Sequence, residues 1–338
     1  MHNNAITPRL ELVTCALFAA ALLLTLHLDL LASLLAGLLV YALVHALVPL
    51  LRLPMVGHEG ARLVAVTLIA TAVIALIAAA GVGIGSFLRH SGESVPVLVH
   101  RMAEIIENSR ASLPSWLLDY VPADANALRV AVVAWLKDNA QLFQVAGTGV
   151  GRALAHILLG MVVGALLSLE AASSHHGSAP LARCLAERAV LLSNAFRRVV
   201  FAQFWISAIN TTLTGIFLVA VLPLFGVELP FTKTLILITF VAGLIPILGN
   251  LISNTAICIV GLSQSLFVAL GVLLYLVVIH KLEYFLNARI VGSQIQARAW
   301  EILLAMLVME AAFGIPGLIA APIFYAYAKD ELSSRNLI

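Results

Sequence analysis

The chain has 338 residues, of which 62% are hydrophobic and only 11% charged, and its mean hydropathy is +1.06. Soluble domains carry about 25% charged residues, so this composition excludes a soluble domain and indicates an integral membrane protein with several crossings. The net charge of +2 gives no reason to expect a nucleic-acid partner, and the three cysteines lack metal or redox spacing. We therefore expect the lipid bilayer as the main partner, with no cofactor and no metal.

Residues 1–85 predict three transmembrane helices. Runs without Asp, Glu, Lys or Arg cover residues 12–28, 30–51 and 63–88, and Asp29 makes a very tight connection between the first two. The first run leads directly into the second without a convincing cleavage pattern, which indicates an uncleaved membrane anchor.

Residues 86–151 predict a small helical insertion outside the membrane. Five Lys or Arg and six Asp or Glu occur between residues 86 and 150. Apolar residues recur there at helical spacing, which is typical of amphipathic helices. The insertion is short for an independent core, so we expect it to pack against the membrane domain.

Residues 152–338 predict a transmembrane core with three more full crossings, at 153–169, 199–227 and 265–287. Within this core, 47 consecutive residues between Lys233 and Lys281 include no charged residue. A helix needs about 20 apolar residues to span a bilayer, so this run is far longer than one crossing requires.

Two apolar units of the core, 232–263 and 302–328, are interrupted by glycine and proline. The breaks contain Pro246 and Gly249 in the first unit and Gly314 and Pro316 in the second. Each arm has 12 to 14 residues, or roughly 18–21 Å of helix, which is too short to span about 30 Å of hydrocarbon. Each unit is therefore either one kinked crossing or a re-entrant hairpin that enters and leaves on one side.

The predicted fold is thus an all-α polytopic membrane protein with about six full crossings and two broken or re-entrant units, nominally eight segments. Paired broken segments are the best sequence indication of a transport site. The alternative is glycine and proline packing without a site, because both residues are frequent in membrane helices.

The arginine bias of short loops predicts cytoplasmic N- and C-termini in a bacterial-type inner membrane. Loop 51–62 has two Arg and one Glu, and loop 174–198 has four Arg and one Glu, whereas residues 86–150 are nearly balanced and are predicted outside. Segment 288–299 lies inside if the broken units are hairpins and outside if they are kinked crossings, and its Arg289 and Arg298 favour hairpins. Hairpins would make the two halves of the core an inverted repeat.

The motifs of the core resemble those of the AI-2E transporter family, named for the exporter of autoinducer-2. The residues that carry the resemblance are Gln203, the run Gly243–Gly249, Glu283 before Asn287, the run Phe313–Gly317, and Ala321 with Pro322. Members of this family have been assigned to autoinducer-2 release and to sodium (lithium)/proton antiport. The resemblance therefore implies transport without naming the solute.

Glu310 is the leading candidate for ion coupling, because it is an acidic residue among apolar neighbours just before the second break. Apolar burial disfavours the charged form of a carboxylate, which suits proton binding, although a structural pairing with a cation such as Lys281 is the alternative. Glu283 matches the acidic position of the family.

Uncharged polar residues near the first break are candidates for contacting a polar solute. They are Asn250 and Asn254 after the break, and Gln203 and Asn210 in the crossing at 199–227. These side chains could instead satisfy the broken backbone or hold helices together.

We expect a secondary transporter that exports a small polar solute, similar to autoinducer-2, by alternating access at a site between the two broken units. A sodium (lithium)/proton antiporter and a non-transporting scaffold that binds through residues 86–150 are the alternatives. No catalytic pair or ATP-binding motif suggests an enzyme. Helices rich in Gly and Ala suggest a homo-oligomer.

Overall fold

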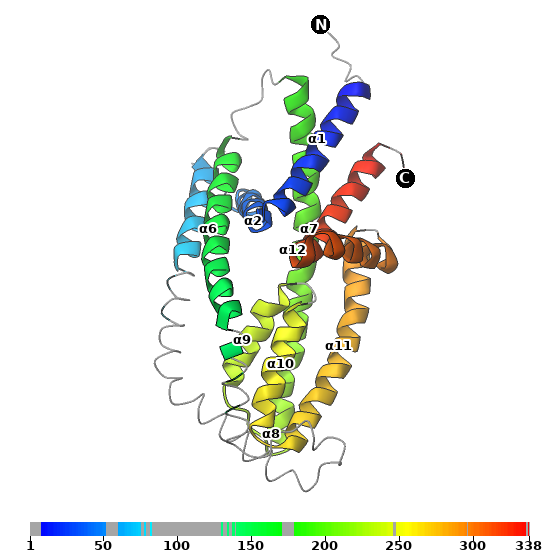
Figure 1. Cartoon of the computed structure of the whole chain (residues 1–338). Coiled ribbons are helices and arrows are strands. Elements are labelled where there is room, and N and C mark those ends of the chain that lie inside the picture. Colours follow the sequence, from blue (N-terminus) through cyan, green and yellow to red (C-terminus); the bar gives the residue numbers. More distant parts are fainter. Residues whose placement is uncertain are drawn as a thin grey trace. The chain divides into compact units, whose positions relative to one another are not determined.

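The computed structural model describes residues 8–51, 60–75, 140–170, 179–245, 248–295 and 297–335, together with isolated residues between 78 and 138 and residue 337. All regular secondary structure within these ranges is helical (Figure 1). The all-α architecture is therefore confirmed. Most of the predicted insertion at 86–151 and the residue Pro246 lie outside the described residues.

The helices follow the predicted crossings in order, with somewhat different ends. Their bounds are α1 Pro8–His27, α2 Leu31–Leu47, an unlabelled helix Gly60–Ala75, α6 Ala140–Glu170, α7 Pro180–Ile216, a π-helical turn Phe217–Val221, α8 Leu222–Leu224, α9 Thr232–Gly243, α10 Leu248–Leu262, α11 Leu266–Ile295 and α12 Ala299–Ser334. Helix α7 joins most of the predicted loop 174–198 to the predicted crossing at 199–227 without a break. Helix α6 begins inside the predicted insertion, so its first turns continue directly into the fourth crossing.

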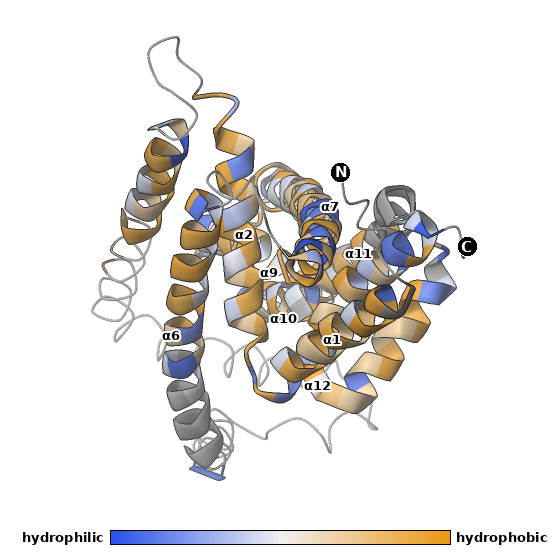
Figure 2. Ribbon diagram, turned by 90° about the horizontal axis from the view of Figure 1, so that it is seen from above, coloured by the Kyte–Doolittle hydropathy of each residue, from blue (hydrophilic) through white to orange (hydrophobic). Residues whose placement is uncertain are grey.

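Four of the described helices are long and apolar enough to cross a membrane, and five shorter apolar helices accompany them. The four are Leu10–His27, Gly151–Glu170, Pro180–Leu224 and Trp300–Ser334. Large apolar side chains such as Leu12, Leu159 and Phe267 are exposed on the chain, and hydrophobic residues cover much of α1, α6 and α12 (Figure 2). Apolar outer surfaces of this extent are typical of helices that face lipid rather than water.

The chain separates into two compact units. Unit 1 contains residues 1–79, 147–200 and 292–338, and unit 2 contains residues 80–146 and 201–291. The first broken unit belongs to unit 2, and the second belongs to unit 1.

In unit 1, glycines allow α2 and α6 to approach closely. A Cβ atom at Gly160 would lie 2.0 Å from the carbonyl oxygen of Ser33, and one at Gly164 would lie 2.2 Å from that of Gly37. Small residues at such contacts let helix backbones pack tightly in a membrane, where no hydrophobic effect drives association. The turn between α1 and α2 is as tight as predicted, with Asp29 in the left-handed region at φ 56°.

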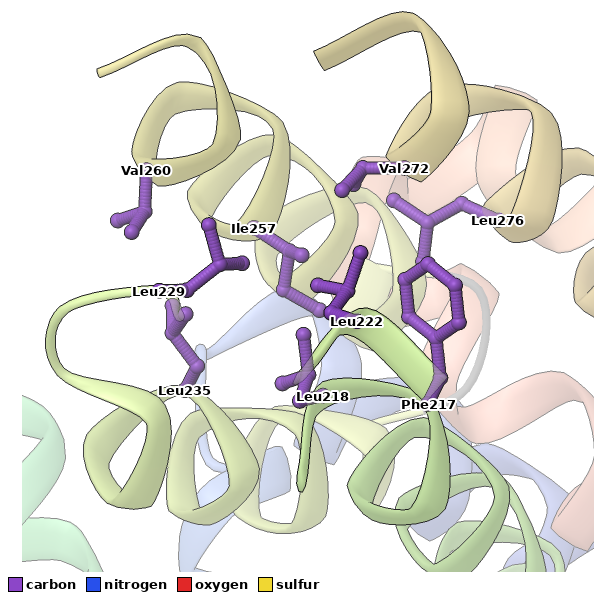
Figure 3. Packing of buried hydrophobic residues seen from close by; sticks show 9 residues of the cluster. All are labelled: Phe217, Leu218, Leu222, Leu229, Leu235, Ile257, Val260, Val272 and Leu276. Carbon is purple, nitrogen blue, oxygen red and sulfur yellow. The ribbon is translucent and has the colours of Figure 1, made fainter. Parts of the chain in front are cut away.

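In unit 2, the core lies between the end of α7 and the helices α9, α10 and α11 (Figure 3). Phe217 and Leu218 of the π-helical turn face apolar residues of the neighbouring helices, including Ile257, and Phe217 also stacks on Tyr275 with ring centroids 3.7 Å apart. Pro223 explains the π-helical turn, because proline has no N–H to donate to the carbonyl four residues earlier and its ring crowds that carbonyl.

Candidate functional site

The first broken unit folds back on itself as a helical hairpin of α9 and α10. A Cβ atom at Gly249 would lie 2.1 Å from the carbonyl oxygen of Ala242. In a straight helix these residues would be about 10 Å apart along the axis, so the chain reverses between them. Glycine is required at position 249 because any larger side chain would collide with the backbone of the opposite arm.

Helix α7 holds the tip of this hairpin with a row of uncharged polar side chains. Gln203 donates from Nε2 to the carbonyl oxygen of Gly243 at 2.7 Å, and Ser207 donates from Oγ to that of Phe240, also at 2.7 Å. One turn further on, Asn210 donates from Nδ2 to Oδ1 of Asn250 at 3.2 Å. The spacing of three and four residues places all three donors on one face of α7.

Two of these bonds satisfy the end of α9. The last carbonyl groups of a helix have no partner within it, and inside a membrane no bulk water replaces the missing donor. Gln203 and Ser207 supply that donor for α9, so their first role is to stabilise the break. Gln203 is one of the site residues predicted from the sequence, whereas Ser207 is not.

Asn210 remains incompletely satisfied. Its side chain is buried, with 7% of the residue exposed, and its Oδ1 has no hydrogen-bond partner within the described part of the chain. Oγ1 of its neighbour Thr211 is also buried, and it has no hydrogen-bond partner among the residues that the structure describes. A buried acceptor without a donor costs roughly 1–3 kcal/mol, and such atoms in native proteins commonly bind water, ions or ligands.

The second broken unit also folds back on itself, within α12. Gly314 adopts φ 63° and ψ −146°, a conformation that only glycine reaches easily. Glu301 Oε2 accepts hydrogen bonds from Tyr325 Oη at 2.6 Å and from Lys329 Nζ at 3.1 Å. In a straight helix Glu301 would lie about 36 Å from Tyr325 and about 42 Å from Lys329.

The tip of this second hairpin is closely packed. A Cβ atom at Gly317 would lie 2.0 Å from the carbonyl oxygen of Met309 in the opposite arm. Figure 1 shows the first arm in dark orange and the second arm in red running in clearly different directions. Gly314 therefore turns the chain, and Gly317 lets the two arms touch.

A cluster of charged residues ties the end of α12 to α1 and α7 within unit 1. Glu331 forms an ion pair with Arg188 at 3.2 Å and with Arg335 at 2.9 Å, and Arg335 also donates to Glu11 at 2.8 Å. The side chains of Arg188 and Glu331 are only 3% and 7% exposed. In the sequence, Arg188 contributes only to the arginine bias of loop 174–198, and nothing there predicts the cluster.

These contacts bring several chain ends to the same end of unit 1. Glu11 lies in the first turn of α1, Arg188 in the early part of α7, and Glu331 in the last turns of α12. Glu301, at the start of α12, bonds to Lys329 and so lies near the same end. Glu11, Arg188 and the last turns of α12 therefore lie together, and Glu301 contacts those turns through Lys329.

The predicted site residues fall into two groups in the two units. Gln203, Asn210, Gly249 and Asn250 are gathered at the first hairpin, and Asn254 is half-buried one turn further along α10. Gly314, Pro316 and Glu310 belong to α12, where Pro316 is half-buried and Glu310 is exposed. Glu283 lies in α11, but its side chain, like Pro246, is outside the described residues.

The site has few groups suited to metal binding. Within the described ranges, no three His, Cys, Asp or Glu residues are gathered in a way that could hold a metal ion. The first hairpin and its partner helix present amides and hydroxyls instead. Such groups form hydrogen bonds with uncharged polar molecules and carry no net charge.

An all-helical chain with apolar outer faces and glycine-built hairpins belongs to the class of polytopic membrane proteins. The model of the family described as "AI-2E family transporter" matches residues 12–334, so the chain belongs to the AI-2E transporter family. This result confirms the family resemblance noted in the sequence.

A curated relative from Bacillus subtilis (strain 168), titled "Putative transport protein YdbI", is 29% identical over 147 residues. The aligned part is 43% of this chain and 40% of the relative, so the chain spans well under half of that protein in the alignment. No solved structure matches the chain.

Proposed function

We propose that the protein is a gradient-driven secondary transporter that exports a small, uncharged polar solute of the autoinducer-2 kind by alternating access. The observation that carries this proposal is the closure of α12 by Glu301, Tyr325 and Lys329, because it makes the second broken unit a hairpin. Broken helices at corresponding positions are the common way in which transporters build a site at membrane depth.

Both hairpins are re-entrant in this proposal. The base of the second hairpin lies at the same end of unit 1 as the start of α1 and the charged cluster around Glu331. The arginine bias of the loops places that end in the cytoplasm. Segment 288–299 is then cytoplasmic, as the hairpin interpretation of the sequence requires.

The first hairpin supplies the solute contacts in this proposal. Asn210 and Asn250 form one amide pair, and the free Oδ1 of Asn210 is available to accept a hydrogen bond from a solute hydroxyl. The surrounding residues 234–280 contain no Asp, Glu, Lys or Arg. A neutral site of this kind favours a neutral solute, because a bare cation would need oxygen ligands with more negative charge to replace its water.

The second candidate is a sodium or lithium/proton antiporter, and one observation favours it. Glu310 is an exposed carboxylate on the first arm of α12, close to the bend at Gly314. A carboxylate at membrane depth is costly unless it binds a proton or a cation during transport. In the exporter, the same residue would bind the coupling proton.

A flux assay in proteoliposomes separates the candidates. Purified protein is tested with a panel of radiolabelled neutral polyols, and separately with sodium and lithium, each with and without an imposed pH gradient. Polyol flux that depends on the gradient supports the exporter, whereas proton movement that requires sodium or lithium supports the antiporter. A non-transporting scaffold would show neither, and it would lose its function on deletion of residues 86–150.

A further inference from the structure

The two arms of α12 are held very differently within unit 1. The second arm is tied to its neighbours near its C-terminal end, where Asp330 pairs with Arg198 and Glu331 pairs with Arg188. Arg335, just after the helix, pairs with Glu11 of α1. These contacts join the second arm to two other helices and hold it in place.

The first arm has far fewer polar attachments. Its acidic residues are Glu301 and Glu310, and among the residues that the structure describes neither forms an ion pair with α1 or α7. Near the bend, Met309 and Phe313 pack against a small apolar cluster that includes Leu26 of α1. Met306 is also buried, and Gly317 packs against Met309 at the bend. Among the described residues, the side-chain polar contact that joins the first arm to the second is that of Glu301 with Tyr325 and Lys329.

The contact at Glu301 can be released more easily than the buried ion pair of the second arm. Lys329 and Glu301 are 24% and 19% exposed, so water can replace the partners when the pair separates. Arg188 and Glu331 are 3% and 7% exposed, so separating them would leave a buried charge without a partner. The contact at Glu301 can therefore break and re-form, while the buried pair of Arg188 and Glu331 persists.

We propose that the first arm of α12, from Ala299 to Phe313, is the moving gate of the transporter. It swings about Gly314, and Glu301 acts as the latch that holds it closed against Tyr325 and Lys329. The second arm and its ion pairs form the fixed frame. This inference rests on the proposed transport function, and it adds which of the two arms moves and what holds it.

Cysteine pairs test the gate without removing the latch. Leu303 on the first arm and Ala328 on the second are exposed, and so is Arg197 on α7. Leu303→Cys with Ala328→Cys spans the proposed moving contact. Arg197→Cys with Ala328→Cys is the matched control across the fixed contact. Each pair is cross-linked with bifunctional thiol reagents of graded length and assayed for flux before and after reduction.

The gate predicts that short cross-links between residues 303 and 328 abolish flux and that reduction restores it. Cross-links between residues 197 and 328 should leave flux unchanged. Normal flux with a short 303–328 cross-link would overturn the proposal, because the first arm could not then move away from the second.

A distance measurement tests the motion independently of flux. Spin labels on the same pairs should give two distance populations for 303–328 and one for 197–328. Tyr325→Phe removes one hydrogen bond from the latch and should raise the ratio of open to closed populations by about tenfold or more. A single 303–328 distance that is insensitive to Tyr325→Phe would overturn the latch. If the unmodified protein transports no solute although two 303–328 distances are present, the proposed transport function is wrong, but the inference that the first arm moves is supported.

Discussion

The buried ion pair between Arg188 and Glu331 allows a quantitative prediction. Glu331→Gln keeps the shape of the side chain and removes its charge, which leaves the buried guanidinium of Arg188 without a counter-charge. Removing one partner of a buried pair typically costs about 3–5 kcal/mol. At about 2–4 °C per kcal/mol, the midpoint of thermal unfolding in detergent should fall by roughly 10 °C.

Asp330→Asn is the matched control, because Asp330 is the neighbouring residue and also pairs with an arginine, Arg198. These two side chains are 27% and 31% exposed. Solvent compensates for the lost charge at such a site, so the cost should be about 0–1 kcal/mol and the midpoint should fall by no more than about 4 °C.

A second substitution tests whether the unpaired charge of Arg188 causes the destabilisation. Arg188→Met, added to Glu331→Gln, removes the buried charge that the first change leaves unpaired, while Arg335 keeps its bond to Glu11 at 2.8 Å. The double variant should therefore be more stable than Glu331→Gln alone. The reasoning is refuted if Glu331→Gln is as mild as Asp330→Asn, or if Arg188→Met lowers the midpoint further.

Four more predictions follow from the hairpins. Gly317→Ala places a Cβ atom 2.0 Å from a backbone oxygen and should cost about 1–3 kcal/mol or more by thermal unfolding, whereas Gly271→Ala, which meets nothing within 4 Å, should cost nothing. Glu310→Gln should stop gradient-driven flux while solute binding, measured by calorimetry, survives; unchanged flux at every pH would exclude the coupling role. Pro316→Ala should lower flux without lowering expression, and equal flux would leave this proline as a packing residue. Ser293→Cys should react with a membrane-impermeant thiol reagent only from the cytoplasmic side, and labelling from outside would contradict the re-entrant hairpin.

The membrane class, the helical architecture and the positions of both breaks could be predicted from the sequence. Each of these depends on composition or on a few neighbouring residues. The run of 47 uncharged residues and the Gly-Pro breaks are local features of this kind. The family resemblance could also be recognised from the sequence, because each of its motifs between Gln203 and Pro322 consists of one residue or a short run of neighbouring residues.

The direction of the chain after each break was decided only by tertiary structure. A kinked crossing and a hairpin have the same local sequence. At the second break, they differ in whether Glu301 can reach Lys329, which lies 28 positions later in the chain. The roles of individual polar residues also depend on the tertiary structure. Gln203 is a candidate both for contacting a solute and for satisfying the broken backbone, and the structure shows it donating to the carbonyl group of Gly243 at the end of α9.

The charged cluster of unit 1 shows most clearly what could not be predicted from the sequence. Arg188 and Glu11 are 177 positions apart, and the sequence presents Arg188 only as part of a basic segment. Packing α1, α7 and α12 together removes water from Arg188 and Glu331, and this desolvation makes their charges depend on each other. Local sequence determines which residues can carry charge into the membrane domain, but only the packed structure determines which of those charges must be paired.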